Sequence, residues 1–195
     1  MLAVLATPRR IKGSRRHQRR VASRMWLPGQ YYDSEMGLNY NYLTGKATER
    51  GRAGLIAAFA PDAGESSGGI SQAKPPAAFS NIAPDSDGYL WIKYDKFHES
   101  SCQDLSADEA LVMAITQKAP LRSTFADAIT APAWKKKPSW YQISSEDRMI
   151  NPENQKMMSA RMNPRKVITL SASHASLASH PVEVAGLIDE AASSA

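Results

Sequence analysis

Cysteine is almost absent from this sequence of 195 residues, in which Cys102 is the single example. One cysteine excludes an internal disulfide framework and a zinc cluster built from cysteines, and it is typical of a reducing compartment. No apolar run reaches the roughly 20 residues of a transmembrane helix, and the apolar stretch 1–7 is too short and wrongly flanked for a secretion signal. We therefore expect a cytoplasmic protein that makes no membrane contact.

Acidic residues are absent from the first 24 positions, which carry eight arginines and lysines. The whole chain has a net charge of +5, so residues 25–195 are mildly acidic. A short basic run without interleaved aromatic residues is more typical of a disordered tail than of a surface that binds nucleic acid. We predict a disordered basic arm over residues 1–24 and no nucleic-acid partner.

Residues 25–50 form a second, tyrosine-rich segment that reads PGQYYDSEMGLNYN over 28–41. Turn formers separate two strand-prone tyrosine pairs, which favours a hairpin. The segment resembles the conserved core of recombination-hot-spot (RHS) repeat proteins, with Met36 at a position where threonine is usual. A single repeat cannot bury its own apolar face. The sequence after residue 42 lacks the further repeats that such a shell needs.

From residue 54 onward, short apolar runs alternate with helical patterns, which indicates α/β organisation. The chain length allows one core of ordinary size. Ser106 and Glu109 form a capping box that begins one helix, and Pro152 and Pro181 mark the starts of two others. Three strands are expected from short β-prone or unbroken apolar runs, at 55–60, 138–144 and 166–170.

Two polar residues follow two of these strands. Asp147 comes after the strand at 138–144, and His174 comes after the strand at 166–170. Functional groups of open α/β sheets gather at the carboxyl ends of the strands, so both side chains are expected in one crevice. Either residue alone is also compatible with an ordinary loop position. Their order matches the last two members of a serine, aspartate, histidine triad, in which the acid orients the imidazole and the imidazole takes a proton from the serine.

The residues around this pair, EDRMINPE over 146–153 and Ser173-His174, resemble the C-terminal part of an α/β-hydrolase. The resemblance is to bacterial esterase-like relatives of plant methylesterases and hydroxynitrile lyases, and it covers about 54–193. It implies a cap over the active site at about 62–134 and the last sheet strands and helices at about 135–195. The fold class it implies is a truncated α/β-hydrolase with about three parallel strands, flanking helices and a cap. It also implies catalytic roles for Asp147 and His174, a small apolar ester-like ligand, and no cofactor or metal.

The same resemblance predicts that the catalytic serine is missing. In that family the nucleophile lies in a G-x-S-x-G turn before the strand that corresponds to 55–60, where this chain has the RHS-like residues. The sequence contains one literal match, GESSG over 64–68, with Ser66 as its serine. A true nucleophile turn joins a strand directly to a helix, and Pro61 interrupts that pattern. We therefore expect Ser66 to lie in a surface loop and the isolated chain to have little activity.

The sequence is compatible with three interpretations. The first is an incomplete hydrolase whose strand at 55–60 has lost a neighbour, so that its apolar edge favours self-association or pairing with a complementary hydrolase half. The second is an RHS-related polymorphic protein that carries a variable C-terminal module. The third is a non-catalytic binding module whose cap holds a small apolar ligand.

Overall fold

A six-stranded sheet is organised around the strand β7 (Ser139–Ser144), whose six residues are all buried. The computed structural model describes residues 2–5, 30–33, 38–41, 54–57 and 59–193. Within these residues the strand order is β2-β3-β4-β1-β7-β8. The other five strands of this sheet are β1 (Leu2–Leu5), β2 (Gln30–Asp33), β3 (Leu38–Asn41), β4 (Gly54–Ala57) and β8 (Lys166–Leu170).

The three strands expected from the sequence are present as β4, β7 and β8, and all three run in the same direction. β8 pairs with β7 in parallel. β1 lies between β4 and β7 and is antiparallel to both, which makes β4 and β7 parallel to each other in space. β3 pairs with β4 in parallel as well. Two of the five pairings in the described sheet are parallel and three are antiparallel, so the sheet is mixed, with β3, β4, β7 and β8 running in one direction.

Two expectations about the N-terminal half are wrong. Residues 2–5 do not belong to a disordered arm, because they form β1 in the interior of the sheet. The expected open edge on the strand near 55–60 is absent too, since β4 has β1 on one side and β3 on the other. The physical reason is the same for both: the backbone of residues 2–5 pairs with groups that would otherwise be exposed. Residues 6–24 lie outside the described residues.

The predicted hairpin is confirmed. β2 and β3 pair antiparallel, with Tyr31 opposite Tyr40. The rest of the tyrosine-rich segment lies outside the described residues, so its boundaries at 25 and 50 stay predictions. A second, two-stranded sheet is formed by β5 (Ile82–Pro84) and β6 (Leu90–Ile92).

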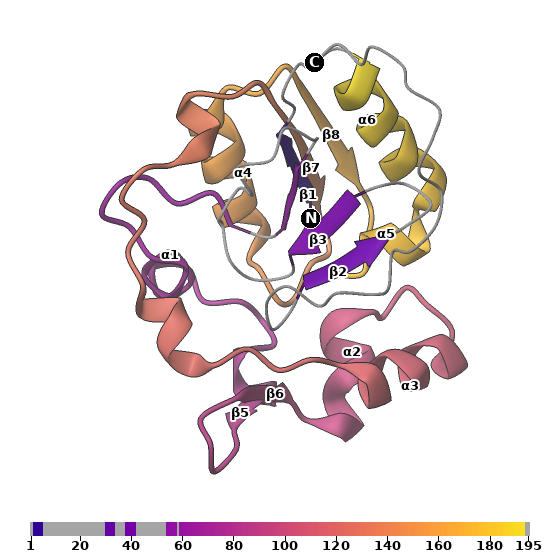
Figure 1. The fold of residues 1–195 in the computed structure, drawn as a ribbon. Coiled ribbons are helices and arrows are strands. Elements are labelled where there is room, and N and C mark those ends of the chain that lie inside the picture. Colours follow the sequence, from indigo (N-terminus) through magenta and orange to yellow (C-terminus); the bar gives the residue numbers. More distant parts are fainter. Residues whose placement is uncertain (1, 6–29, 34–37, 42–53, 58, 194–195) are drawn as a thin grey trace, which may run out of the picture.

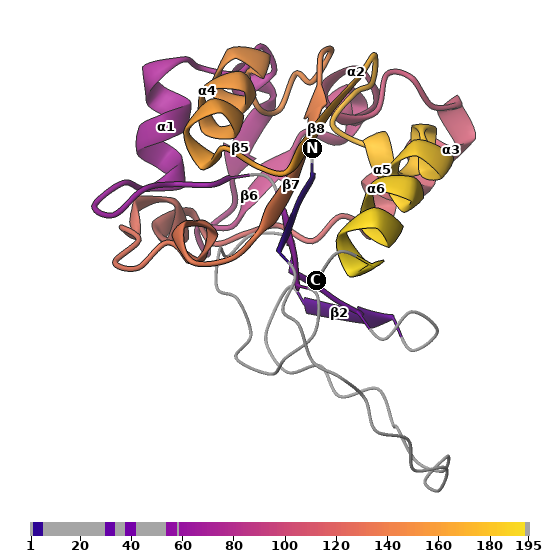
Figure 2. The same cartoon turned by 90° about the horizontal axis from the view of Figure 1, so that it is seen from above.

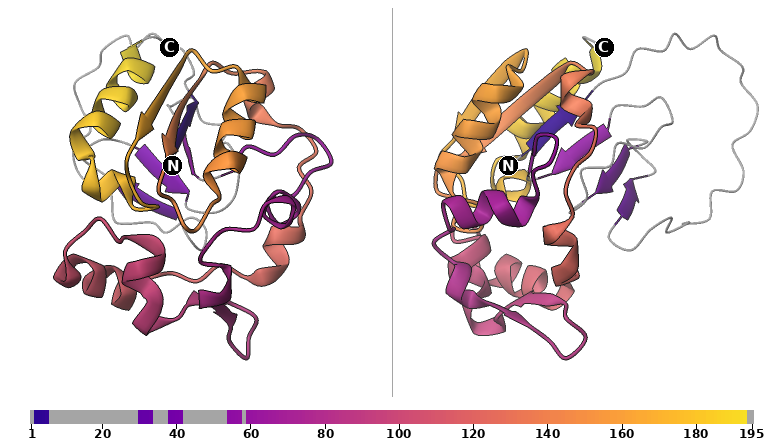
Figure 3. Two further views of the ribbon diagram at one scale, coloured as in Figure 1. Left: turned by 180° about the vertical axis from the view of Figure 1, so that it is seen from behind. Right: turned by 90° about the vertical axis from the view of Figure 1, so that its left-hand side faces the viewer.

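Helices cover both faces of the main sheet (Figures 1 and 2). One face carries α4 (Pro152–Met162), with α1 (Ser67–Ala73) beyond it, and the other face carries α5 (Ser176–Ser179) and α6 (Pro181–Ser193). α2 (Phe97–Ser101) and α3 (Ala107–Thr116) lie with β5 and β6 past one end of the sheet, as Figure 3 shows from two further sides. The described part of the chain also has four short 3-10 helices: η1 (Phe79–Asn81), η2 (Tyr94–Lys96), η3 (Arg122–Ala126) and η4 (Ala133–Lys135).

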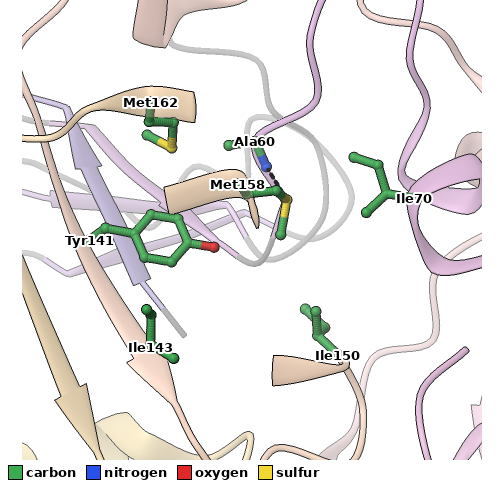
Figure 4. Packing of buried hydrophobic residues seen from close by; sticks show 7 residues of the cluster. All are labelled: Ala60, Ile70, Tyr141, Ile143, Ile150, Met158 and Met162. Carbon is green, nitrogen blue, oxygen red and sulfur yellow. Dashed lines mark hydrogen bonds between the residues drawn. The ribbon is translucent and has the colours of Figure 1, made fainter. Parts of the chain in front are cut away.

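The side chains of β7 alternate between the two helical layers. Tyr141 and Ile143 pack with Met158 and Met162 of α4, together with residues from α1 and the loops (Figure 4). Trp140 packs on the opposite face with residues of α6, namely Val184, Leu187 and Ala191. This period of two is that of a strand buried on both faces. The alternation therefore fixes which helix covers which side of the sheet.

Local signals place the helix starts where the sequence predicts them. The Ser106 side chain accepts from the Glu109 backbone N–H at 3.3 Å, and Glu109 Oε2 accepts from the Ser106 backbone N–H at 3.1 Å. Both halves of the capping box are thus formed at the start of α3. Asn151 caps α4 by accepting from the Glu153 N–H at 2.9 Å, with Pro152 in the first turn. In the described part of the chain, no helix has the length and apolarity to cross a bilayer.

Candidate functional site

Asp147 lies in the loop between β7 and α4, with 3% of its surface exposed. Its Oδ1 atom accepts two backbone hydrogen bonds, from Met149 at 2.8 Å and from Ile150 at 2.9 Å. These bonds close the turn that leads into α4, so local sequence fixes the position of the carboxyl group. Its second oxygen, Oδ2, takes no part in this turn and accepts hydrogen bonds from other segments of the chain.

His174 lies in the loop between β8 and α5 and meets this second oxygen. The distance from His174 Nδ1 to Asp147 Oδ2 is 2.9 Å. The parallel pairing of β7 with β8 brings the two loops together, because it places Ser144 opposite Leu170 at the strand ends. The Glu146 N–H continues the pairing beyond the strands by donating to the Ala172 carbonyl at 3.1 Å. The expected meeting of Asp147 and His174 at the carboxyl ends of the strands is therefore present.

Gln155, on α4, is a third member of the site that the sequence analysis did not identify. Its Nε2 donates to Asp147 Oδ2 at 2.9 Å and to the Ile150 carbonyl at 3.0 Å. Its Oε1 accepts from the Ser144 N–H at 2.9 Å. The side chain is fully buried. No sequence motif marks this glutamine. The one signal in the sequence is that a polar residue stands on the helix face that otherwise carries buried apolar residues.

The Asp147 carboxylate is stabilised in its charged form despite its burial. Burial opposes ionisation, yet the adjacent His174 ring and the backbone hydrogen bond from Ile150 outweigh it, and the pKa of Asp147 lies below its ordinary value. An ionised carboxylate has no proton to donate, so His174 Nδ1 is the donor in this contact. In the neutral ring Nε2 is then the basic nitrogen.

The His174 side chain keeps limited contact with solvent. Its relative exposure is 15%, whereas that of the Asp147 side chain is 0%. The hydrogen bond between them is therefore shielded on the carboxylate side, where low local polarity strengthens it. An imidazole held in one tautomer and backed by a buried carboxylate is an arrangement that accepts and returns protons.

Ser66 is placed in a different role from that of the pair. It lies directly before α1, with backbone angles φ −121° and ψ 157°, and its Oγ accepts from the Gly69 N–H at 3.1 Å. A helix does follow this serine, since α1 begins at Ser67. The two views in Figures 1 and 2 place α1 on the α4 side of the sheet, opposite α5, which begins two residues after His174. The hydroxyl of Ser66 is thus engaged as a helix cap.

The remaining histidines of the described residues make local contacts. His98 Nε2 lies 2.9 Å from the Leu105 carbonyl oxygen, and His180 Nδ1 lies 2.9 Å from Ser179 Oγ. Over residues 59–193 and the four described strands before them, no group of three or more histidine, cysteine, aspartate or glutamate side chains is arranged to hold a metal ion.

Comparison with known proteins bears on the fold and the family of this chain. The family model described as the alpha/beta hydrolase family matches residues 22–187. A pyrethroid hydrolase from Sphingobium faniae JZ-2 superposes with a TM-score of 0.54 at 18% identity, covering 70% of this chain and 58% of that one. A polyneuridine aldehyde esterase mutant superposes with a TM-score of 0.52 at 16% identity, covering 67% of this chain and 58% of that one. The comparison with curated proteins found no match.

The chain spans a little under three fifths of the length of these two solved structures. At these identities the likeness shows the fold, and it covers 67–70% of this chain. The family match covers far more than half of the sequence and includes Asp147 and His174. The chain therefore belongs to the α/β-hydrolase family.

Proposed function

We propose that this chain provides the acid and base of a carboxylic-ester hydrolase. Asp147 is the orienting acid, and His174 is the general base. The observation that carries the proposal is the 2.9 Å contact between His174 Nδ1 and a carboxylate that is wholly shielded from solvent. This geometry fixes the tautomer that an acyl-transfer base requires.

The proposed chemistry follows from the two nitrogens of the ring. His174 Nε2 accepts the proton of a hydroxyl group as that oxygen forms a bond to the ester carbonyl carbon. The resulting imidazolium is stabilised by the Asp147 carboxylate. It then returns the proton to the departing alcohol oxygen as the ester C–O bond breaks, leaving an acyl group on the hydroxyl oxygen. Water then attacks the acyl carbonyl carbon with the same two proton transfers through His174, which releases the carboxylic acid and restores the hydroxyl group.

The nucleophile is proposed to come from outside this chain, supplied by a complementary hydrolase half. Two observations at Ser66 support this: its extended backbone and its hydroxyl bound to the Gly69 N–H. The substrate class is proposed to be a small apolar carboxylic ester. Support comes from the two solved structures named above, which are described as a pyrethroid hydrolase and an aldehyde esterase.

The first test measures hydrolysis of p-nitrophenyl butyrate by the purified full chain, beside the His174→Ala and Ser66→Ala variants. We expect the wild-type chain and both variants to stay within a few-fold of the buffer rate, because a base without its nucleophile accelerates little. Enzymatic turnover that Ser66→Ala abolishes would show that the chain supplies its own nucleophile. The matched control is Ser67→Ala, which removes the neighbouring hydroxyl.

The second test examines the acid and base directly. The ring Nδ1–H of a histidine that donates to a buried carboxylate gives a low-field proton NMR signal. We expect one such signal from the wild-type chain, and its loss in both His174→Gln and Asp147→Asn. A folded wild-type chain without this signal contradicts the assignment of the two residues.

The RHS-related alternative rests on the β2–β3 hairpin, which falls on the RHS-like residues. It requires unrelated sequence after about residue 50. The family match starts at residue 22 and runs across that position, which favours a hydrolase as the function of the whole match. Deleting residues 1–50 separates the two: a hydrolase sheet loses β1, β2 and β3 and is destabilised, whereas an independent C-terminal module keeps its thermal midpoint.

A further inference from the structure

Residues 99–104 comprise the last three residues of α2 and the first three residues of the loop that leads to α3, and they contact the loop that carries Asp147. We call this segment the cap strap. Arg148 Nη1 donates to the Glu99 carbonyl at 2.8 Å, and Gln103 Nε2 donates to the Glu146 carbonyl at 2.7 Å. Both chain neighbours of Asp147 are therefore bound to the cap strap.

The cap strap also binds both chain neighbours of His174. The Ser173 N–H donates to Asp104 Oδ2 at 2.9 Å. The Ala175 N–H donates to the Ser101 carbonyl at 3.1 Å. The backbone on each side of the imidazole is thus held by the same six-residue segment. One short piece of the cap therefore links the loop of the acid to the loop of the base.

Ser173 stabilises the backbone around His174. It is fully buried, and its Oγ accepts from the Ala175 N–H at 3.0 Å, which closes a turn around the histidine. The side chains of Ser173 and Ser179 also lower the pKa of the Asp104 carboxyl group. The printed contact of Asp104 with this segment is the hydrogen bond that its Oδ2 accepts from the Ser173 N–H. Hydrogen bonds to an ionised carboxylate are stronger than those between neutral groups.

The Asp104 carboxyl group is charged at neutral pH. Its partial burial raises the pKa. The interactions with Ser173 and Ser179 lower the pKa by a larger amount, so it lies below the ordinary value. Asp104 as a residue is exposed to solvent. Its attraction for the loop therefore comes from donors at short range, above all the N–H of Ser173, the residue next to His174.

We propose that Asp104 is a positioning residue that holds the His174 imidazole against Asp147 by clamping the β8–α5 loop to the cap strap. This inference rests on the proposed function of Asp147 and His174. Asp104 acts through Ser173, one residue before the base. The cap then does more than cover a substrate, because its α2–α3 connection sets the geometry of proton transfer.

The test follows the exchange with water of the His174 Nδ1–H proton by NMR, in the full chain. Asp104→Asn removes the charge and keeps the shape. We expect exchange to become faster by on the order of tenfold, the effect of weakening a hydrogen bond to a charged group. Asp108→Asn, on the exposed first turn of α3, is the matched control and should leave the rate unchanged. Ser173→Ala removes the hydroxyl that accepts from the Ala175 N–H beside His174, and it is expected to accelerate exchange in the same way.

A rate in folded Asp104→Asn within twofold of the wild type overturns the proposal. An equal acceleration in Asp108→Asn also overturns it, because the effect would then arise from net charge. If Asp104→Asn does not fold, Ser173→Ala decides by the same criterion. Absence of the low-field signal from the wild-type chain is a different outcome: it overturns the acid and base assignment itself.

Discussion

Gln155 Nε2 lies 2.9 Å from Asp147 Oδ2, the same oxygen that accepts from His174 Nδ1 at 2.9 Å. One carboxylate oxygen therefore joins the helix α4 to the loop after β8. The other oxygen is used by the backbone N–H groups of Met149 and Ile150. A buried charge of this kind persists only when its acceptor sites are filled.

Replacing Gln155 should expose the cost of this burial. Gln155→Leu keeps the volume similar but leaves the Ser144 N–H, the Ile150 carbonyl and the carboxylate each short of one partner. We expect the free energy of unfolding to fall by about 2–4 kcal/mol, measured by urea denaturation. Gln72→Leu, on the exposed surface of α1, is the control and should change it by less than about 0.5 kcal/mol. Equal losses in the two variants would show that the buried network contributes nothing special.

The stabilising effect of Asp147 should disappear in acid. Its pKa in the folded chain lies below the ordinary value, while the unfolded chain titrates near about 3.9. The carboxylate thus contributes stability that is complete above the unfolded pKa and is lost as the pH falls through the folded pKa. The difference in unfolding free energy between wild type and Asp147→Asn should therefore narrow from pH 7 to pH 3. A difference that stays constant over this pH range would refute the prediction.

Neighbouring methionines on α4 offer a matched test of core packing. Met158 is fully buried against Tyr141 and Ile150, whereas Met157 is 40% exposed. Met158→Ala should lower the free energy of unfolding by about 2–5 kcal/mol, because it leaves a cavity between α4 and β7. Met157→Ala should cost less than about 1 kcal/mol. Chemical denaturation of both variants at one pH measures the contrast, and the reverse order would contradict the packing of this helix.

Cys102 should be unreactive while the chain is folded. It is completely buried, and burial raises the pKa of its thiol to about 11. The reactive thiolate is therefore scarce at pH 8 and out of reach of reagents. We expect slow labelling by a disulfide reagent such as DTNB in buffer and rapid, complete labelling in urea. Fast labelling of the folded chain would place the α2–α3 packing in doubt.

Much of the local structure could be read from the sequence, because it depends on residues close together in the chain. The capping box at Ser106 and Glu109 and the apolar runs of β7 and β8 act over a few positions. The meeting of Asp147 and His174 was also predictable, although the two residues are far apart in the chain. Each follows a strand, and strands that run in the same direction in an α/β sheet end at the same edge of the sheet.

The sequence by itself determined the α/β class, the helix starts and the positions of Asp147 and His174. Only the tertiary structure decided that residues 2–5 lie between β4 and β7. Strands pair through backbone groups that every residue has, so the sequence of a strand says little about which other strand it joins. The tertiary structure also decided that Gln155 and Asp104 support the pair from α4 and from the cap strap. Their role arises from neighbours that are distant along the chain, where a single polar residue leaves no pattern to read.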